Sequence, residues 1–411
     1  MLLIASVVDI ASKAFRVPYT VALVVAGLIL GLTGLYGNVR LSEPVILLGL
    51  LPPLVFEGAL NVHLAELRRR WIQVGALAVL GTILTAVGIA GVLIVVPGMP
   101  ASAAWLIAVI LAPTDPVSVL AIFKTAGVPD GLRTLLEGES LFNDALGLVL
   151  YVVAVELVFP GRSPITALDI AADFGRAVGY GTLVGLIVGW IAHHLMATMH
   201  DHLIETTLSI VTAYGSYLLA DNVHGSGIIA TIVAGLLIGN YDKDRAMSPD
   251  SRSTVLAFWQ SITFLANSAL FLLIGLGFHI SSLDDRRTIL ALAAAVVMML
   301  ATRAVLVWGL LPPFCRRRSD AAPPVPRPWK AAIYWGGLRG GIPIALVLGL
   351  EGRQVGSLNA EPIVFALVLF SLVVQGVTYK PLLRRLGLLA PVGEQADMGN
   401  ERTIIGEGSD G

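Results

Sequence analysis

The sequence predicts an all-α polytopic membrane protein, and three observations support this prediction. Of the 411 residues, 56% are apolar and only 13% are charged, about half of the roughly 25% charged share that soluble domains carry. The mean hydropathy is +0.83. Apolar stretches of about 20 residues, the length that spans roughly 30 Å of hydrocarbon, recur from end to end. A transmembrane β-barrel would instead show short alternating segments.

Hydropathy divides the chain into about thirteen membrane segments. In order, they cover residues 2–15, 18–36, 43–61, 72–97, 102–123, 133–158, 168–197, 203–220, 224–240, 254–279, 288–314, 330–350 and 361–383. We expect residues 1–390 to form one transmembrane domain, and the polar, Gly-rich stretch 391–411 to be a disordered cytoplasmic tail. The first cations, Lys13 and Arg16, follow the first apolar run. This order is the reverse of a signal peptide, so we expect no cleavable signal.

The positions of Lys and Arg predict the orientation, because cytoplasmic connections carry an excess of both. With the N-terminus outside, most of the 27 Lys and Arg residues fall at inner connections, inner span ends or the C-terminal tail. The outer connections hold Arg40, Arg162, Arg286, Arg287 and Arg353. We therefore expect an outside N-terminus, a cytoplasmic C-terminus and a location in the inner (plasma) membrane.

Charge and cysteine content exclude other classes of protein. The net charge of −1 gives no indication of a nucleic-acid partner. Cys315 is the single cysteine, which rules out an internal disulfide or a multi-cysteine metal site. Small-residue spacing at Gly27 and Gly31 predicts close helix packing.

The fifth segment predicts an interrupted helix at Leu111-Ala-Pro-Thr-Asp-Pro-Val117. Pro113 and Pro116 lack an N–H, so the carbonyls of Val109 and Ala112 lose their helical donors. Proline also disfavours helix in the residue before it. Irregular backbone at membrane depth is tolerated only where it is buried or lines a cavity.

The twelfth segment predicts a second break at Tyr334-Trp-Gly-Gly-Leu-Arg-Gly-Gly-Ile-Pro-Ile344, where four glycines surround Arg339. If segments 1–6 and 8–13 form two six-helix units of inverted topology, both breaks fall on the fifth helix of a unit. Matching broken helices in inverted repeats indicate a transporter site near the bilayer midplane.

A charged residue in the sixth segment gives the site its chemistry. Asp144 lies in an otherwise apolar helix, where an acid is costly unless it is paired, hydrated or neutralised. Ser140 is four residues earlier and so shares a helix face with it. Together with Thr114 and the freed carbonyls, these groups supply the oxygen ligands that hard cations prefer. We therefore expect Asp144 to bind a cation that crosses the membrane.

Several other polar residues are expected to support this site. Glu139 and Arg339 are predicted to form a buried ion pair, since each would be costly alone. The neutral Asn143 is expected to hydrogen-bond the broken helix. Glu57 is an acid within a span that either reaches the ion through water or makes a structural hydrogen bond. Asp115 flanks the first break and is a candidate counter-charge for a half-helix N-terminus.

These motifs resemble the sodium/proton exchanger branch of the monovalent cation/proton antiporters, the NhaP-type proteins. The matching motifs are Thr114-Asp115-Pro116, Glu139-Ser140-x-x-Asn143-Asp144, Gly337-Leu338-Arg339-Gly340 and Phe258-Trp259-x-x-x-x-Phe264-Leu265-x-Asn267. The resemblance covers about residues 10–385, and the short first helix departs from the family pattern.

The resemblance implies a fold and a set of roles. It implies thirteen helices and a homodimer in which a mobile six-helix core moves against dimerisation helices. Thr114, Ser140 and Asp144 would coordinate Na⁺, with Asp115 contributing nearby oxygen and Glu57 acting through water. Glu139 would pair with Arg339. Asn143 stands where the electrogenic branch has a second aspartate, which implies electroneutral one-for-one exchange.

The sequence therefore predicts a secondary antiporter and not an enzyme, with no cofactor, in which Asp144 binds Na⁺ (or Li⁺) and H⁺ in turn. A K⁺/H⁺ antiporter is the alternative. A cation channel would use similar oxygens. An intramembrane aspartyl protease would need two acids on facing helices, usually with a Gly-x-Gly-Asp run, which this chain does not contain.

Overall fold

The computed structural model describes most of the membrane segments and little of the connections between them. The described residues are 2–15, 18–33, 45–115, 119–120, 123, 127–159, 167–198, 201–240, 249–277, 286–315, 324–350 and 360–389. The predicted tail 391–411 lies outside them.

The described chain is helical, with no strand among the described residues. Its helices, with π-helical segments written η, are α1 (Leu2–Phe15), α2 (Tyr19–Leu32), η1 (Val45–Leu50), α3 (Leu51–Asn61), α4 (Leu64–Gly75), η2 (Ala76–Leu80), α5 (Gly81–Val95), α6 (Ala101–Leu111), α8 (Asp130–Val158), α9 (Ala167–Thr198), α10 (His202–Asn222), α11 (Gly227–Asn240), α13 (Pro249–Gly277), α14 (Arg286–Ala304), η4 (Val305–Leu310), α15 (Leu311–Cys315), α16 (Arg327–Trp335), α17 (Gly341–Leu348), α18 (Ala360–Phe370), η5 (Ser371–Gly376) and α19 (Val377–Arg385).

The helices confirm the predicted fold class. Within the described residues, 7 continuous helices are long and apolar enough to cross a bilayer, and three shorter apolar helices, α2, α6 and α11, accompany them. The chain is therefore a multi-pass membrane protein. The total of thirteen spans and the inverted repeat stay predictions.

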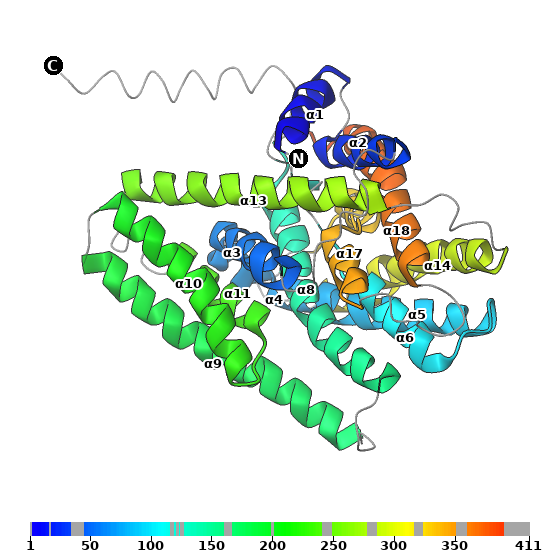
Figure 1. Ribbon diagram of the computed structural model, residues 1–411, viewed down its shortest axis with the longest axis horizontal. Helices are drawn as coiled ribbons and strands as arrows, with labels where there is room; N and C mark the ends of the chain where they lie inside the picture. The colour runs from blue at the N-terminus through cyan, green and yellow to red at the C-terminus, as the bar shows by residue number, and fades with distance from the viewer. Residues whose placement is uncertain are drawn as a thin grey trace.

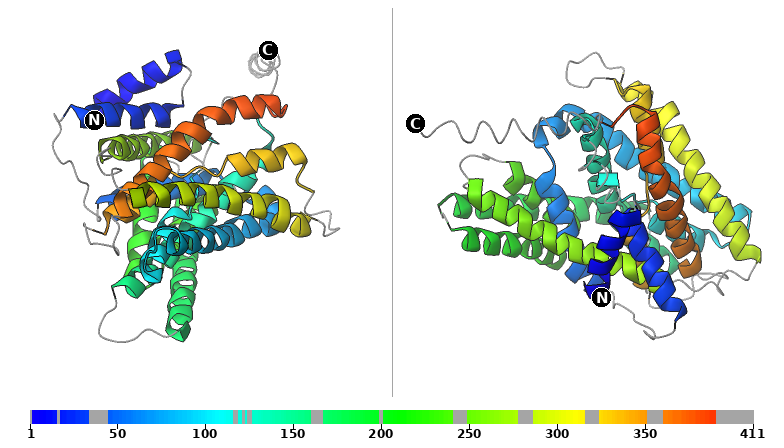
Figure 2. Two further views of the ribbon diagram at one scale, coloured as in Figure 1. Left: turned by 90° about the vertical axis from the view of Figure 1, so that its right-hand side faces the viewer. Right: turned by 90° about the horizontal axis from the view of Figure 1, so that it is seen from above.

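The helices gather into two groups around α8. In Figure 1, α9 and α10 lie at one side of the molecule with α11 and α3 next to them toward its centre, while α5, α6 and α14 lie at the other side. The contacts between helices follow the same division: α9 packs on α11, and α5 packs on both α6 and α14. The orthogonal views in Figure 2 show α1 and α2 stacked together on one face of α13.

One predicted boundary differs from the structure. Hydropathy starts the fourth segment at residue 72, but the helix begins at Leu64 and continues without interruption to Val95. Its first turns contain Arg68, Arg69 and Arg70, which lower the hydropathy without disfavouring helix. Hydropathy marks where a helix becomes apolar and not where it starts.

Helices α2 and α13 pack closely, and glycine makes this packing possible. A Cβ on Gly27 would overlap the Leu272 carbonyl oxygen, and one on Gly275 would stand 2.5 Å from the Leu28 nitrogen. The hydroxyls of Tyr19 and Ser268 share a hydrogen bond of 2.7 Å across the same interface. The small-residue spacing in α2 thus serves packing, as predicted.

The aromatic motif in α13 ties three helices together. The Trp259 indole N–H donates a hydrogen bond of 2.9 Å to the Ser209 hydroxyl on α10. The ring of Trp259 also packs on Phe56 of α3 with centroids 4.8 Å apart. This motif therefore stabilises the group of helices around α3.

Gly275→Ala is expected to destabilise the protein, because the added methyl group has no room at the α2–α13 contact. Overpacking of this kind costs about 1–3 kcal/mol, visible as a lower unfolding temperature in detergent. Gly175→Ala on α9 is the matched control, because a Cβ there meets no atom within 4 Å. Equal unfolding temperatures for the two variants would contradict this packing argument.

Candidate cation site at two crossed helix breaks

The first predicted break is confirmed and begins at its prolines. Helix α6 ends at Leu111, and residues 112–115 are irregular. The carbonyl of Val109, which Pro113 cannot serve, accepts the N–H of Ala112 at 3.2 Å. The carbonyl of Ala112, which Pro116 cannot serve, accepts instead from the Arg339 guanidinium. Both orphaned acceptors thus find the partners that a buried backbone requires.

The second predicted break is also confirmed. Helix α16 ends at Trp335 and α17 begins at Gly341, with residues 336–340 between them. The glycines allow the backbone to approach neighbouring groups closely. At Gly340, for example, a Cβ would overlap the Asp115 carboxylate.

The two breaks meet each other directly. The Asp115 backbone N–H donates to the Leu338 carbonyl at 2.8 Å. In the opposite direction, the Arg339 guanidinium donates to the Pro113 carbonyl at 2.7 Å as well as to Ala112. Two segments more than 220 residues apart in the sequence are therefore joined by hydrogen bonds. The backbone groups involved would bond within the helix if the helices were continuous.

Arg339 neutralises the end of α6. It is 2% exposed, and its positive charge lies against the C-terminal carbonyls of α6, where the helix dipole is negative. Its own backbone N–H donates to the Ser371 hydroxyl at 2.8 Å, which fixes the second break to η5.

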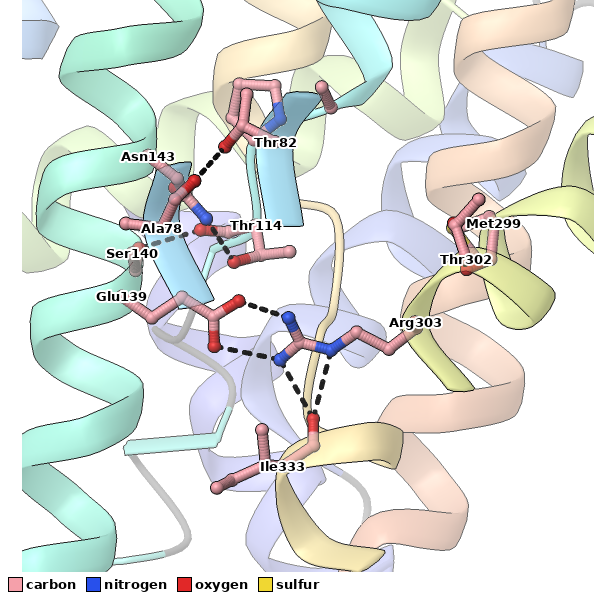
Figure 3. A network of polar contacts seen from close by, with 12 residues as sticks. Ala78, Thr82, Thr114, Glu139, Ser140, Asn143, Met299, Thr302, Arg303 and Ile333 are labelled. Carbon is pink, nitrogen blue, oxygen red and sulfur yellow. Dashed lines mark hydrogen bonds and ion pairs between the residues drawn. The ribbon is translucent and has the colours of Figure 1, made fainter. Parts of the chain in front are cut away.

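The predicted ion pair between Glu139 and Arg339 is wrong. Glu139 pairs instead with Arg303 of α14 in a two-pronged contact (Figure 3), in which Nη2 donates to Oε2 at 2.9 Å and Nη1 donates to Oε1. The Arg303 side chain is 7% exposed and the Glu139 side chain is 2% exposed. Arg339 instead bonds the carbonyls at the end of α6 through Nη1.

The second break also explains the position of Arg303. Because α16 stops at Trp335, the Ile333 carbonyl lacks a helical donor, and Arg303 supplies two, from Nε at 3.2 Å and from Nη2 at 2.9 Å. Arg303 was not among the residues that the sequence predicted for this site. A buried arginine in an apolar helix was nevertheless a signal, because such a charge needs an acid partner.

Thr114 connects the first break to α8. Figure 3 shows the Ser140 hydroxyl donating to the Thr114 carbonyl at 2.7 Å and the Asn143 amide donating to the Thr114 hydroxyl at 2.6 Å. The predicted contact of Asn143 with the broken helix is thus present. All three side chains are buried.

Asp144 lies one turn after Ser140 on the same helix. Its Oδ1 is buried and has no hydrogen-bond partner, and the carboxyl interacts electrostatically with Asp115 and Arg339. The Oδ1 of the neighbouring Asn143 is also buried without a partner. An unsatisfied buried carboxylate oxygen is costly, so this part of the site is suited to a ligand that supplies positive charge.

Glu57 lies on α3, at the side of the site. Its Oε1 accepts a hydrogen bond of 2.8 Å from the Asn61 amide one turn later. Helix α3 contacts α8 at Gly58, where a Cβ would stand 3.8 Å from Leu141 Cδ1. A direct role of Glu57 in cation binding stays a prediction.

The donor set is made of oxygen atoms. Carboxylate, hydroxyl and carbonyl oxygens gather at the crossing, and these suit hard cations. Within the described residues, no group of three or more His, Cys, Asp and Glu side chains is arranged to hold a metal ion. Two broken helices that cross beside a buried acid define a secondary-transporter architecture.

Comparison with solved structures agrees with this class. The fold matches that of the sodium proton antiporter MjNhaP1 from Methanocaldococcus jannaschii, with a TM-score of 0.74 over 95% of this chain and 97% of that chain at 21% identity.

Sequence comparison then defines the family. Residues 2–385 match the family described as "Sodium/hydrogen exchanger, transmembrane". The low-affinity Na⁺/H⁺ antiporter NhaS1 of Synechocystis is 37% identical, over 91% of this chain and 70% of its own length. The Na⁺/H⁺ antiporter ApNhaP of Aphanothece halophytica is 34% identical, over 94% and 73%. The chain belongs to the sodium/hydrogen exchanger family, whose members are transporters and not enzymes.

Glu139→Gln is expected to lower the free energy of unfolding by about 3–5 kcal/mol, because it leaves the Arg303 charge buried without a counter-charge. Thermal unfolding in detergent measures the loss. Asp173→Asn is the control, since Asp173 pairs with Arg176 at an exposed position, where a pair contributes about 0–1 kcal/mol. A Glu139→Gln variant as stable as this control would show that the buried pair contributes little.

Proposed function

We propose that this protein is a secondary active antiporter that exchanges Na⁺ for H⁺ by alternating access, with Asp144 shared by the two ions. One observation carries the proposal: a buried Asp144 oxygen without a partner lies beside two crossed helix breaks. The family and the names of the relatives, which are Na⁺/H⁺ antiporters, support Na⁺ and H⁺ as the exchanged ions.

Na⁺ binds at Asp144, Ser140 and Thr114 in this proposal. The Ser140 hydroxyl already donates to the Thr114 backbone carbonyl, so the two residues offer neighbouring oxygen atoms to a cation at Asp144. Asp115 contributes a further oxygen nearby, and Glu57 acts through water. Asn143 holds the Thr114 hydroxyl in position.

The charges of the site favour a one-for-one exchange. Glu139 and Arg303 neutralise each other. Asp144 interacts with Arg339 and Asp115. With all three groups ionised, they carry one net negative charge, which a single Na⁺ or a single H⁺ neutralises. The neutral Asn143 adds no second titrating group.

Coupling follows from the cost of the empty site. A loaded Asp144 is neutralised and can pass between the two faces, whereas an empty, charged Asp144 in the membrane interior is costly to move. The site therefore faces one side with Na⁺ and returns with H⁺. This penalty suppresses slippage, and it also distinguishes the mechanism from a channel.

The wider assembly is part of the same proposal. Residues 1–390 form a core bundle and dimerisation helices, and two copies associate as a homodimer in the inner membrane. The N-terminus is outside and the C-terminus is cytoplasmic, as the distribution of Lys and Arg indicates.

Asp144→Asn is expected to reduce exchange at least about a hundredfold, because the amide cannot alternate between a proton and Na⁺. The assay is the collapse of a pH gradient in proteoliposomes upon addition of Na⁺, Li⁺ or K⁺ in turn. Glu156→Gln, at an exposed position of the same helix, is the control and retains exchange. Sodium-driven proton movement that persists in Asp144→Asn would refute the shared site, as long as the variant unfolds at the wild-type temperature.

Exchange is expected to be independent of membrane voltage, because one positive charge moves in each direction. Proteoliposomes with the voltage clamped by K⁺ and valinomycin test this independence. Asn143→Asp is the informative comparison, since it adds a second acid next to Asp144. A wild-type rate that changes with voltage, together with net charge movement, would reject one-for-one exchange.

A further inference from the structure

A surface groove of about 580 Å³ lies between two helices away from the proposed cation site. One wall is the α4–η2 segment, with Trp71, Gly75, Ala76 and Val79, and the other is α15, with Pro313 and Phe314. The volume falls in the range of small-molecule sites, roughly 300–1,000 Å³. Trp71 is 65% exposed and Val79 is 46% exposed, so the groove opens to the membrane.

The sequence explains why this space is open. Gly75 and Ala76 have little or no side chain, and a Cβ added at Gly75 meets no atom within 4 Å. One wall includes the π-helical segment η2, and the other directly follows η4; the wider turns of such segments disturb regular helix packing. Segments of this kind are frequent at functional sites. Large side chains, Trp71 and Phe314, border the small ones.

A cation precedes the groove-lining residues of α4 in the sequence. Arg68 is three residues before Trp71 and therefore shares its helix face. It is exposed, and no described residue forms an ion pair with it. The two arginines that follow it have partners. Arg69 is 4.0 Å from Glu66. Arg70 is buried, pairs with Glu66 at 2.6 Å and lies over the Trp329 ring.

We propose that this groove binds an anionic phospholipid, with one acyl chain between α4–η2 and α15 and the phosphate at Arg68. The apolar walls fit a hydrocarbon chain, and Arg68, with which no described residue forms an ion pair, fits a charged headgroup. An uncharged lipid would fill the groove and leave Arg68 without a counter-charge. Anionic lipids are attracted to basic groups near the membrane surface.

The sequence next to α15 is consistent with this headgroup chemistry. Cys315, which ends α15, is followed by Arg316, Arg317 and Arg318. These arginines lie outside the described residues and are not part of the proposed site, but they make the local sequence basic. The site is independent of the proposed ion exchange, so each proposal can fail without the other.

The test is lipid retention by the full-length protein. Wild type and variants are reconstituted in nanodiscs of equal phosphatidylcholine and phosphatidylglycerol, released into detergent, and examined by native mass spectrometry. Gly75→Phe fills the groove, and Gly91→Phe is its control, because Gly91 lies on the same continuous helix, is exposed and also has open space at its Cβ. Arg68→Gln removes the cation, and Arg286→Gln is its control.

Two results are expected. Gly75→Phe reduces the retained lipid at least about tenfold, which corresponds to the loss of about two buried methylene groups. Arg68→Gln reduces the preference for phosphatidylglycerol over phosphatidylcholine about fivefold, the effect of one basic group near an anionic surface. Both control variants behave as wild type.

Three results would overturn the proposal. The first is equal retention of the two lipids by the wild type. The second is an Arg68→Gln variant with unchanged lipid preference, an arm that stays decisive if Gly75→Phe does not fold. The third is a Gly75→Phe variant that keeps its lipid but changes the mass of the assembly, which would make the groove a contact between two copies of the chain.

Discussion

The structure depends on how the backbone is satisfied where two helices stop inside the membrane. A helix that ends at this depth leaves carbonyls that no water or lipid can serve. Here each break supplies partners for the other. Arg339 of the second break bonds the carbonyls of the first, and the first break returns an N–H to Leu338. The crossing is thus stabilised by groups that either continuous helix would have used internally.

Two buried arginines each bond the end of one interrupted helix. Arg339 serves the end of α6, and Arg303 serves the end of α16 at Ile333. Arg303 also faces Glu139 and pairs with both carboxylate oxygens. Each arginine thus compensates a helix end, where the dipole is negative. Glu139 neutralises Arg303, so Arg339 is the arginine whose charge is opposed by Asp115 and Asp144.

The sequence was sufficient for the fold class and for both breaks, because proline, glycine and hydropathy act locally. Val109, Ala112, Pro113 and Pro116 predict one break without knowledge of any distant contact. The partner of Glu139 was beyond that reasoning. Two arginines were available, and the choice between them depends on how the helices pack, which the local sequence does not determine. Likewise, hydropathy missed the start of α4, because the first turns of that helix contain arginines.

The hydrogen bonds of the site also explain why Asp144 differs from its other acids. Glu139 has both oxygens bonded to Arg303, and Asp115 lies at the crossing, against Gly340. Asp144 is the acid whose buried Oδ1 is left open, although it interacts with Arg339 from a distance. A fully paired carboxylate would have no need of an ion, and an unopposed one would be too costly in the membrane. In the proposed exchange, partial compensation by Arg339 leaves a charge on Asp144 that either one small cation or one proton neutralises. An exchange site needs this balance, because neither ion is then held so firmly that the other cannot replace it.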